Sequence, residues 1–214
     1  MNLCVIASDS DEFRARVVVP LHRTRRRTVS PPVVDIVIPV RNHESDLAFG
    51  VARLHAFLRT ELPFSARITI ADRASIDATG AVAELLAAEL PDIRVLRINE
   101  VGRGRAVAAA WLTSDARVVA SMDADPCSEL SGLLPLLAPV IAGHTELSVG
   151  VSRGPRRRGL VLELATGARL ATALRADVAR RLLPYVVGRG GLFDAELVLH
   201  ARRAGLRVYE RAMV

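Results

Sequence analysis

The sequence contains no lysine, only two cysteines and few aromatic residues. Because aromatic residues make up 4% of the 214 residues, a buried core must be built from valine, leucine, isoleucine and alanine. Cys4 and Cys127 lie far apart and show no metal-type spacing, so we expect neither a disulfide framework nor an oxidising compartment.

Long apolar runs are also missing, since no stretch approaches the roughly 20 residues that a membrane-spanning helix requires. The first twenty residues include Asp9, Asp11 and Glu12, which is not typical of a signal peptide. We therefore expect a cytoplasmic protein, and peripheral association with the inner face of the plasma membrane stays open.

Arginine supplies all the strongly basic residues, and 29 of them against 23 acidic residues leave a net charge of +6. This excess favours anionic partners: nucleotide phosphates, lipid phosphates or nucleic acid. The arginine-rich run 23–27 and the pair Pro31-Pro32 predict a leader over residues 1–32 that is disordered or loosely attached. One folded domain is expected over residues 33–214. A basic patch on the leader that contacts lipid or nucleic acid is the alternative.

From residue 33 onwards, strand-like and helix-like patterns alternate. Apolar runs predict strands, and apolar residues at three- and four-residue spacing predict helices. The predicted strands cover residues 33–38, 67–71, 93–98, 117–122 and 147–151, and the predicted helices cover residues 47–58, 77–90, 105–111 and 130–141. This alternation predicts an α/β fold with a mostly parallel central sheet.

Polar residues follow the first four predicted strands: Arg41-Asn42, Asp72, Asn99 and the pair Asp123/Asp125. Ligands of open α/β sheets bind beyond the carboxyl ends of the strands. We therefore expect these side chains to share one binding edge.

Asp123 and Asp125 are separated by one small residue at a strand end, and their carboxylates suit Mg²⁺ or Mn²⁺. The alternative is a solvated loop that caps the next helix. Asp72 could accept hydrogen bonds from a base or a ribose, whereas Ser75 or Asp77 is expected to cap the following helix.

The segment Gly102-Arg103-Gly104-Arg105 precedes a predicted helix, where Arg103 could pair with phosphate, although a plain turn fits as well. Arg153 is a second phosphate candidate, with a solvated loop arginine as the alternative. Asp194 and Glu196 open a later amphipathic stretch and could serve as acid/base or acceptor-orienting groups. Their alternative role is to complement a helix dipole.

Together these segments resemble the family 2 glycosyltransferases, and most closely the dolichol- and polyprenyl-phosphate sugar transferases of the actinobacterial type. The segments that carry the resemblance are DIVIPVRN (35–42), ADRASIDAT (71–79), Asn99 with Gly102-Arg103-Gly104, MDAD (122–125), VGVSR (149–153), FDAEL (193–197) and AGLRV (204–208). The match covers about residues 33–210.

The resemblance implies a GT-A fold, which is a Rossmann-like three-layer domain. It also implies inverting, metal-assisted transfer of a sugar from a UDP- or GDP-sugar to a polyprenyl or dolichyl phosphate. Its implied nucleotide-sugar contacts are Pro39, Arg41, Asn42, Asp72, Arg103, Gly104, Asp123, Ala124 and Arg153. Asp123 and Asp125 would bind the metal, and Asp125, Asp194 and Glu196 are the catalytic candidates. A lipid-phosphate acceptor at the membrane surface and a membrane-protein partner are implied, and no nucleic acid is expected.

Some residues depart from the family pattern. Arg41 and His43 stand where the family has Tyr and Glu, and Arg73 replaces Asn or Asp. The segment 153–175 is short and lacks the family's Cys-Gly-Phe element. A degenerate nucleotide-sugar-binding module without turnover is therefore the alternative function.

Overall fold

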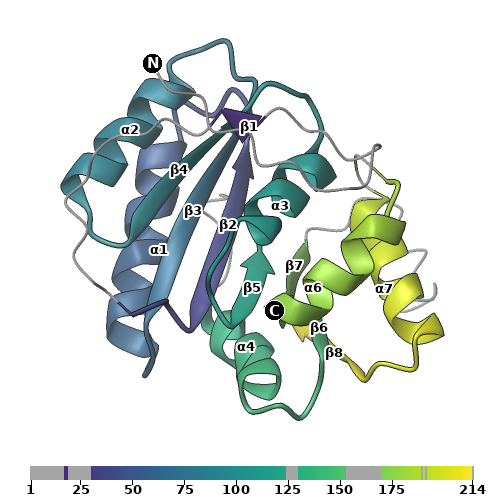
Figure 1. Ribbon diagram of the computed structural model, residues 1–214. Helices are drawn as coiled ribbons and strands as arrows, with labels where there is room; N and C mark the ends of the chain where they lie inside the picture. Colours follow the sequence, from purple (N-terminus) through teal and green to yellow (C-terminus); the bar gives the residue numbers. More distant parts are fainter. Residues whose placement is uncertain are drawn as a thin grey trace.

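The computed structural model describes residues 17–18, 30–123, 130–152, 170–188, 190 and 192–213. These residues form one eight-stranded sheet with the strand order β1-β4-β3-β2-β5-β7-β6-β8 (Figure 1). The strands are β1 (Val17–Val18), β2 (Val34–Val40), β3 (Ala66–Arg73), β4 (Ile93–Ile98), β5 (Val118–Ser121), β6 (Leu147–Ser152), β7 (Leu170–Arg175) and β8 (Val208–Met213).

The sheet is mostly parallel. Strands β4, β3, β2 and β5 pair in parallel, and β6 pairs in parallel with β8. Strand β7 is antiparallel to both β5 and β6, so β6 and β8 run in the same direction as β2, β3, β4 and β5. Strand β1, which falls inside the predicted leader, is antiparallel to β4. The predicted mostly parallel α/β fold is confirmed.

Strand β2 lies at the centre of the fold, and all seven of its residues are buried. A continuous apolar run of this kind is typical of a parallel strand covered on both faces. The charged residue in this apolar run is Asp35. Its buried carboxylate accepts hydrogen bonds from Arg67 at 2.6 Å and from Thr69 and Ser114 at 2.7 Å each. The charge is therefore paired and hydrogen-bonded, as a buried carboxylate requires.

Helices cover both faces of the sheet and create two separate cores, which gives the three layers (Figure 1). One face carries α1 (Leu47–Glu61), α2 (Thr79–Glu89) and α4 (Leu133–Ile141), with the short 3-10 turn Leu130–Gly132 before α4. The other face carries α3 (Arg103–Leu112), α6 (Ala176–Leu182) and α7 (Phe193–Arg203), with the 3-10 turn Leu183–Tyr185 after α6. Within the described ranges, no helix combines the length and the apolar character needed to cross a membrane.

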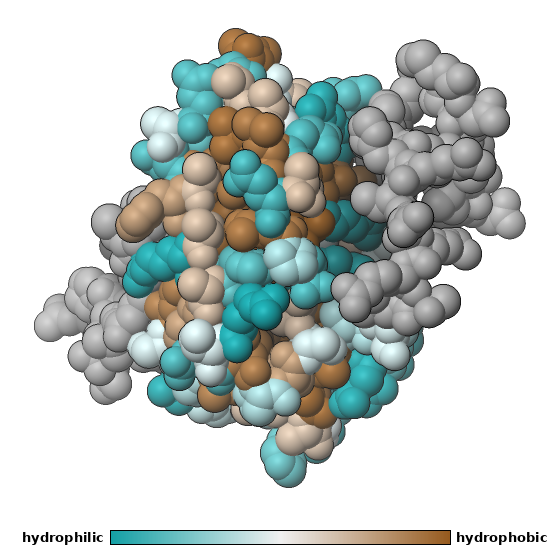
Figure 2. Space-filling model, turned by 90° about the vertical axis from the view of Figure 1, so that its left-hand side faces the viewer, coloured by the Kyte–Doolittle hydropathy of each residue, from teal (hydrophilic) through white to brown (hydrophobic). Residues whose placement is uncertain are grey.

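The outer surface of α1 and α2 is unusually apolar for a solvent-facing layer. Figure 2 shows this side of the molecule, where apolar side chains gather among polar ones. Phe49, Ile76 and Leu85 are the large exposed apolar residues on and next to these two helices.

The structure differs from the sequence predictions in several elements. Strands β1, β7 and β8 and helix α6 were not predicted, because short segments such as LATALR at β7 show no clear two-residue alternation. Helix α3 begins at Arg103, two residues before the predicted start. Helix α2 begins at Thr79 rather than at Asp77, since Asp77 lies in the preceding loop and accepts the N–H of Thr79 at 3.0 Å.

Candidate functional site

The candidate site lies at the carboxyl edge of the sheet, where β2, β3 and β5 end and α3 begins (Figure 1). Val40, the last residue of β2, stands opposite Asp72 in the register of β2 and β3. Asp123 follows β5 by two residues. The structure thus places Pro39, the loop after β2, Asp72 and Asp123 along one edge. The polar residues that follow the predicted strands led us to expect this arrangement.

Arg103 joins two carboxylates at this edge. Its Nη1 donates to Oδ2 of Asp194 at 2.6 Å, and its Nε donates to Oδ1 of Asp123 at 3.3 Å. Asp194 is nearly inaccessible at 3% exposure, and its Oδ1 accepts the hydroxyl of Thr172 at 3.1 Å. Burial lowers the pKa of Arg103, but the charges of Asp194 and Asp123 outweigh burial and raise that pKa above its ordinary value. Arg103 is therefore a fixed cation at the first residue of α3.

Close packing between α3 and α7 makes this bridge possible. Gly104 faces Phe193, and a Cβ on Gly104 would lie 2.6 Å from the Phe193 Cβ. The Phe193 ring packs against Trp111 with ring centroids 5.8 Å apart. The family resemblance implies a nucleotide-sugar contact at Gly104, and in the structure the absence of a Cβ there lets helix α7 approach α3. Gly102 supports the turn into α3 with φ of 144°, which few residues other than glycine adopt.

Arg73 stands close enough to Arg41 and Arg103 for both of their charges to act on it. Burial lowers the pKa of Arg73, and the positive charges of Arg41 and Arg103 lower it further, while Asp123 acts in the opposite direction. The Nε atom of Arg73 is buried and has no hydrogen-bond partner among the described residues. Arg73 therefore lies within electrostatic range of two other guanidinium groups and of Asp123.

Asp72 has a local structural role that the sequence did not predict. It is 6% exposed, and its Oδ1 accepts the N–H of Ser75 at 3.1 Å. This bond closes the turn after β3, in the manner of the local side-chain-to-backbone bonds that Asp often forms. On the other side, Gly80 of α2 lies beside the Asp72 carboxylate and the Arg97 guanidinium. Asp72 thus faces α2, on the opposite face of the sheet from Arg73.

The loops after β2 (residues 41–46) and β3 (residues 74–78), together called the paired loops, are joined by hydrogen bonds. The Asn42 N–H donates to Ser75 Oγ at 3.0 Å, and Asn42 Oδ1 accepts the Ile76 N–H at 3.0 Å. The remaining bonds are His43 N–H to Thr79 Oγ1 at 2.7 Å, Glu44 N–H to Asp77 Oδ2 at 3.3 Å and Ala78 N–H to Glu44 Oε2 at 2.7 Å.

Asn42 and Ala74 adopt positive φ values of 55° and 56° within the paired loops. Asn tolerates this conformation, whereas for Ala it is strained, and such strain persists only where the surroundings hold it. The sequence analysis missed Glu44 and Thr79 as members of this network. The signal that could have revealed this network is the dense series of short polar residues that follows β2 and β3.

Glu196 also has a defined structural partner. Its Oε2 accepts the N–H groups of Val187 and Gly188, both at 2.8 Å, and so closes the loop before α7. Together with Asp194, both predicted catalytic carboxylates of α7 are engaged as hydrogen-bond acceptors. They also lie in the first turn of that helix, where negative charge is favourable.

Asp123 is the described residue best placed to hold a metal ion. Its side chain is 42% exposed, and its Oδ1 lies 3.3 Å from Nε of Arg103. Asp125, Ala124 and Arg153, which the sequence analysis assigned to metal and nucleotide-sugar, lie outside the described residues. Within the described part of the chain, no group of three or more His, Cys, Asp or Glu residues could hold a metal. Asp123 therefore suits an ion that completes its shell with substrate phosphate and water, as Mg²⁺ commonly does.

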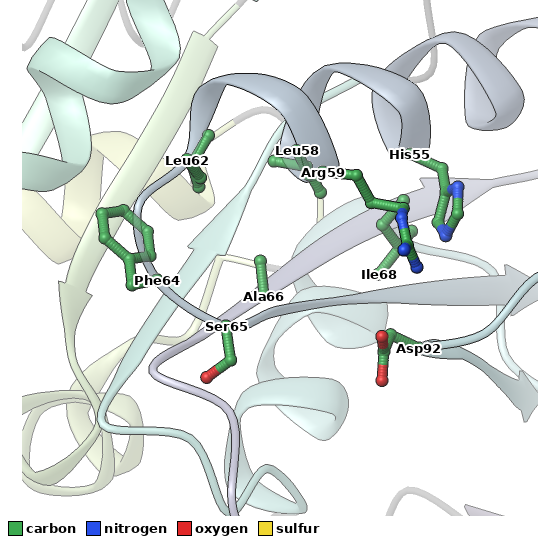
Figure 3. A pocket seen from close by; sticks show the side chains of 9 residues that line it. All are labelled: His55, Leu58, Arg59, Leu62, Phe64, Ser65, Ala66, Ile68 and Asp92. Atoms are coloured by element: carbon green, nitrogen blue, oxygen red, sulfur yellow. The ribbon is translucent and has the colours of Figure 1, made fainter.

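A pocket lies away from this site, between the end of α1 and the start of β3 (Figure 3). It is lined by His55, Leu58, Arg59, Leu62, Phe64, Ser65, Ala66, Ile68 and Asp92. Because Ala66 is the first residue of β3 and Asp72 is near the end of that strand, the pocket and the candidate site lie at opposite edges of the sheet.

Comparison with known proteins bears on both the fold and the site. The profile described as "Glycosyl transferase family 2" matches residues 35–199. A search of curated proteins found no significant match.

Crystal structures of glucosyl-3-phosphoglycerate synthase from Mycobacterium tuberculosis share the fold. The complex with Mn²⁺, UDP and glucosyl-3-phosphoglycerate aligns with a TM-score of 0.62 and 18% identity over 85% of this chain and 70% of that chain. The complex with Mn²⁺, UDP-glucose and phosphoglyceric acid gives a TM-score of 0.63 and 19% identity over 85% and 69%. The complex with Mg²⁺ and UDP gives 0.61 and 18% over the same shares. The GT-A fold that the sequence analysis expected is thereby confirmed.

Proposed function

The chain belongs to glycosyl transferase family 2, and from this premise we propose that it transfers a sugar from a nucleoside-diphosphate sugar to an acceptor phosphate. The observation that carries the proposal is the placement of Arg103 and the half-exposed Asp123 at the start of α3. A helix N-terminus with a guanidinium favours phosphate, and a neighbouring carboxylate can hold a divalent ion between protein and diphosphate.

The donor occupies the carboxyl edge in this proposal. The paired loops form the side of the site where the base and ribose bind, and Asn42 and Asp72 hold those loops in place. Pro39 lies near the end of β2, and Arg41 is the first residue of the paired loops. The similar mycobacterial structures contain UDP or UDP-glucose, which supports a uridine donor as the first to be tested, with GDP-sugars as the alternative.

The metal is Mg²⁺ or Mn²⁺ in this proposal, with Asp123 and Asp125 as its protein ligands. Asp123 fits this role because its carboxylate is accessible at the strand end. Mn²⁺ or Mg²⁺ accompanies UDP in the similar structures, which supports the assignment. When bound, the ion would offset the charge that develops on the departing nucleoside diphosphate.

The state of the two α7 carboxylates bears on the acceptor. Asp194 pairs with Arg103, and Glu196 holds two backbone N–H groups, so neither is free to act as a general base. A hydroxyl acceptor requires a base in the transition state, whereas a phosphate oxygen is already anionic. We therefore favour a phosphate nucleophile, and with it the polyprenyl or dolichyl phosphate that the resemblance implies. Asp194 and Glu196 then act as positioning residues.

The bond changes are simple for such an acceptor. A phosphate oxygen of the acceptor attacks the anomeric carbon of the sugar as the bond from that carbon to the donor diphosphate breaks. The nucleoside diphosphate leaves with its electron pair, and the anomeric configuration inverts. A lipid acceptor would bring the protein to the inner face of the plasma membrane as a peripheral protein, where a membrane-protein partner could supply the acceptor.

A transfer assay with purified full-length protein tests the proposal. UDP-glucose and GDP-mannose are offered with Mn²⁺, together with polyprenyl phosphate in detergent or with 3-phosphoglycerate, because a similar structure contains phosphoglyceric acid. We expect a glycolipid product, and a loss on the order of a hundredfold in Asp123→Asn. Product with 3-phosphoglycerate alone would reject the lipid acceptor but keep the glycosyltransferase assignment.

The alternative function is a nucleotide-sugar-binding module without turnover. The contact of Asp123 with Arg103 favours it, because a paired carboxylate is a weaker metal ligand than a free one. This alternative predicts nucleotide binding without product from either acceptor. Product that is lost in Asp123→Asn would reject it.

A further inference from the structure

Arg73 is a partly buried cation that the proposed function leaves without a role. Its Nε is buried and has no hydrogen-bond partner among the described residues. A buried donor without a partner destabilises the fold, and more so when it is charged. A cost of this kind at the edge of a binding site suggests that the partner is a ligand.

Arg73 points to the α3 side of the sheet. Side chains alternate along a strand, and the preceding Asp72 lies beside Gly80 on the α2 side. Ile98 stands opposite Arg73 in the register, and Ile98 belongs to the core beneath α3. Arg73 therefore projects toward the N-terminus of α3, where Arg103 is held.

Among the described residues at this position, arginines outnumber carboxylates. The positive charges of Arg41 and Arg103 both act on Arg73. Within the same described part of the chain, Asp194 is engaged by Arg103 and Thr172, and Asp123 is the carboxylate whose charge also acts on Arg73. The backbone N–H groups at the start of α3 add further positive potential. Such a site favours an anion with more than one negative charge.

We propose that Arg41, Arg73 and Arg103 bind the two phosphates of the nucleoside diphosphate directly, so that nucleotide binding keeps a component that needs no divalent metal. This inference rests on the proposed function, because it concerns the same donor site. Arg41 and Arg73 stand where the family pattern has Tyr and Asn or Asp, so the additional cations are a feature of this chain. Arg73 and Arg41 thereby select for diphosphates over monophosphates.

Titration calorimetry of the full chain with UDP, GDP and UMP, in EDTA and again in Mn²⁺, tests this inference. Four variants are compared with the unmodified protein: Arg73→Gln, Arg73→Lys, Arg41→Gln and Arg59→Gln. Arg59→Gln is the matched control, since this substitution removes the same charge from the opposite edge of the sheet. Arg41 is exposed, so its replacement keeps the test valid if Arg73→Gln fails to fold.

We expect the unmodified protein to bind UDP or GDP in EDTA, more weakly than in Mn²⁺ and more tightly than UMP. Arg73→Gln and Arg41→Gln should each weaken diphosphate binding in EDTA by roughly tenfold, the size of a lost charged hydrogen bond. Arg59→Gln should bind like the unmodified protein, and Arg73→Lys should lose less than Arg73→Gln.

Two results would overturn the inference. Binding that occurs in Mn²⁺ but vanishes in EDTA would reject the metal-independent component and leave the proposed function intact. Binding in EDTA that survives unchanged in both Arg73→Gln and Arg41→Gln would reject the arginines as its source. An absence of diphosphate binding under both conditions would reject the inference and the proposed donor site together.

Discussion

Arg103 and Asp194 lie 91 positions apart in the sequence, yet Nη1 of the arginine donates to Oδ2 of the aspartate at 2.6 Å. The pair connects the first residue of α3 to the second residue of α7. It also holds the guanidinium that contacts Asp123. The geometry of the candidate site therefore depends on how two helices on one face of the sheet pack together.

Loss of this pair should destabilise the fold. In Asp194→Asn the largely buried Arg103 loses the closer of its two anionic partners, and we expect a loss of about 3 kcal/mol in the free energy of unfolding, as for other broken buried pairs. Urea denaturation measures it. Asp177→Asn is the control, because it breaks an exposed pair with Arg175 at 2.9 Å and should change stability by less than about 1 kcal/mol. Equal effects in the two variants would contradict the account.

Gly104→Ala should weaken the contact between α3 and α7. The added Cβ would lie within 2.6–2.8 Å of three Phe193 side-chain atoms, so one of the helices must move. We expect a loss of about 1–3 kcal/mol in stability, typical of an overpacked core. Gly190→Ala, where a Cβ meets nothing within 4 Å, is the control. Full stability of Gly104→Ala would refute the contact.

Asn42 should matter for two separable reasons. Its side chain accepts the Ile76 N–H at 3.0 Å, and its backbone has φ of 55°. Asn42→Ala loses the bond and gains backbone strain, so we expect a loss of about 2 kcal/mol in stability. Asn42→Gly loses only the bond and should cost about 1 kcal/mol less. Thermal or urea unfolding distinguishes the two, and an identical cost in both variants would reject the role of the backbone conformation.

Glu146 should make the stability of the fold depend on pH. Its hydrogen bonds with Arg207 lower the pKa of Glu146 to about 2, below its ordinary value of 4.5. The pair therefore stabilises the fold above pH 4.5, and that contribution is lost as the pH falls from 4.5 towards 2. At pH 7 the free energy of unfolding of Glu146→Gln should be lower than that of the unmodified protein. This difference should disappear near pH 2.

An Arg207→Gln background supplies the control for this prediction. Without the arginine, Glu146→Gln should cost much less at pH 7, because the partner that lowers the pKa of Glu146 is missing. A cost that stays constant across pH 2–7, or that is the same in both backgrounds, would show that the ion pair is not its cause.

Much of the fold follows from local patterns in the sequence. The run VDIVIPV is apolar enough to predict a strand buried on both faces, and the short polar residues after it predict a loop at the binding edge. Strand β7 could not be predicted in this way, because its six residues show no clear alternation and its place between β5 and β6 is set by long-range pairing.

The site was less predictable than the fold. The partners of Arg103 are remote in sequence, so its pairing with Asp123 and Asp194 depends on helix packing that no local pattern records. The same holds for Glu196, whose carboxylate binds backbone groups eight and nine residues away. Strand alternation predicts that the side chains of Asp72 and Arg73 point to opposite faces of the sheet. The residues that each of them contacts are known only from the structure.

The most direct test of the central claim is calorimetric titration of UDP-glucose and GDP-mannose in Mn²⁺ into the unmodified protein, Asp123→Asn and the control Asp92→Asn. Asp92 lies at the opposite edge of the sheet, where Asn also tolerates its φ of 61°. We expect binding of one donor, a loss of at least about tenfold in Asp123→Asn and no change in Asp92→Asn. Equal binding by all three proteins, or no binding by folded protein, would contradict the central claim.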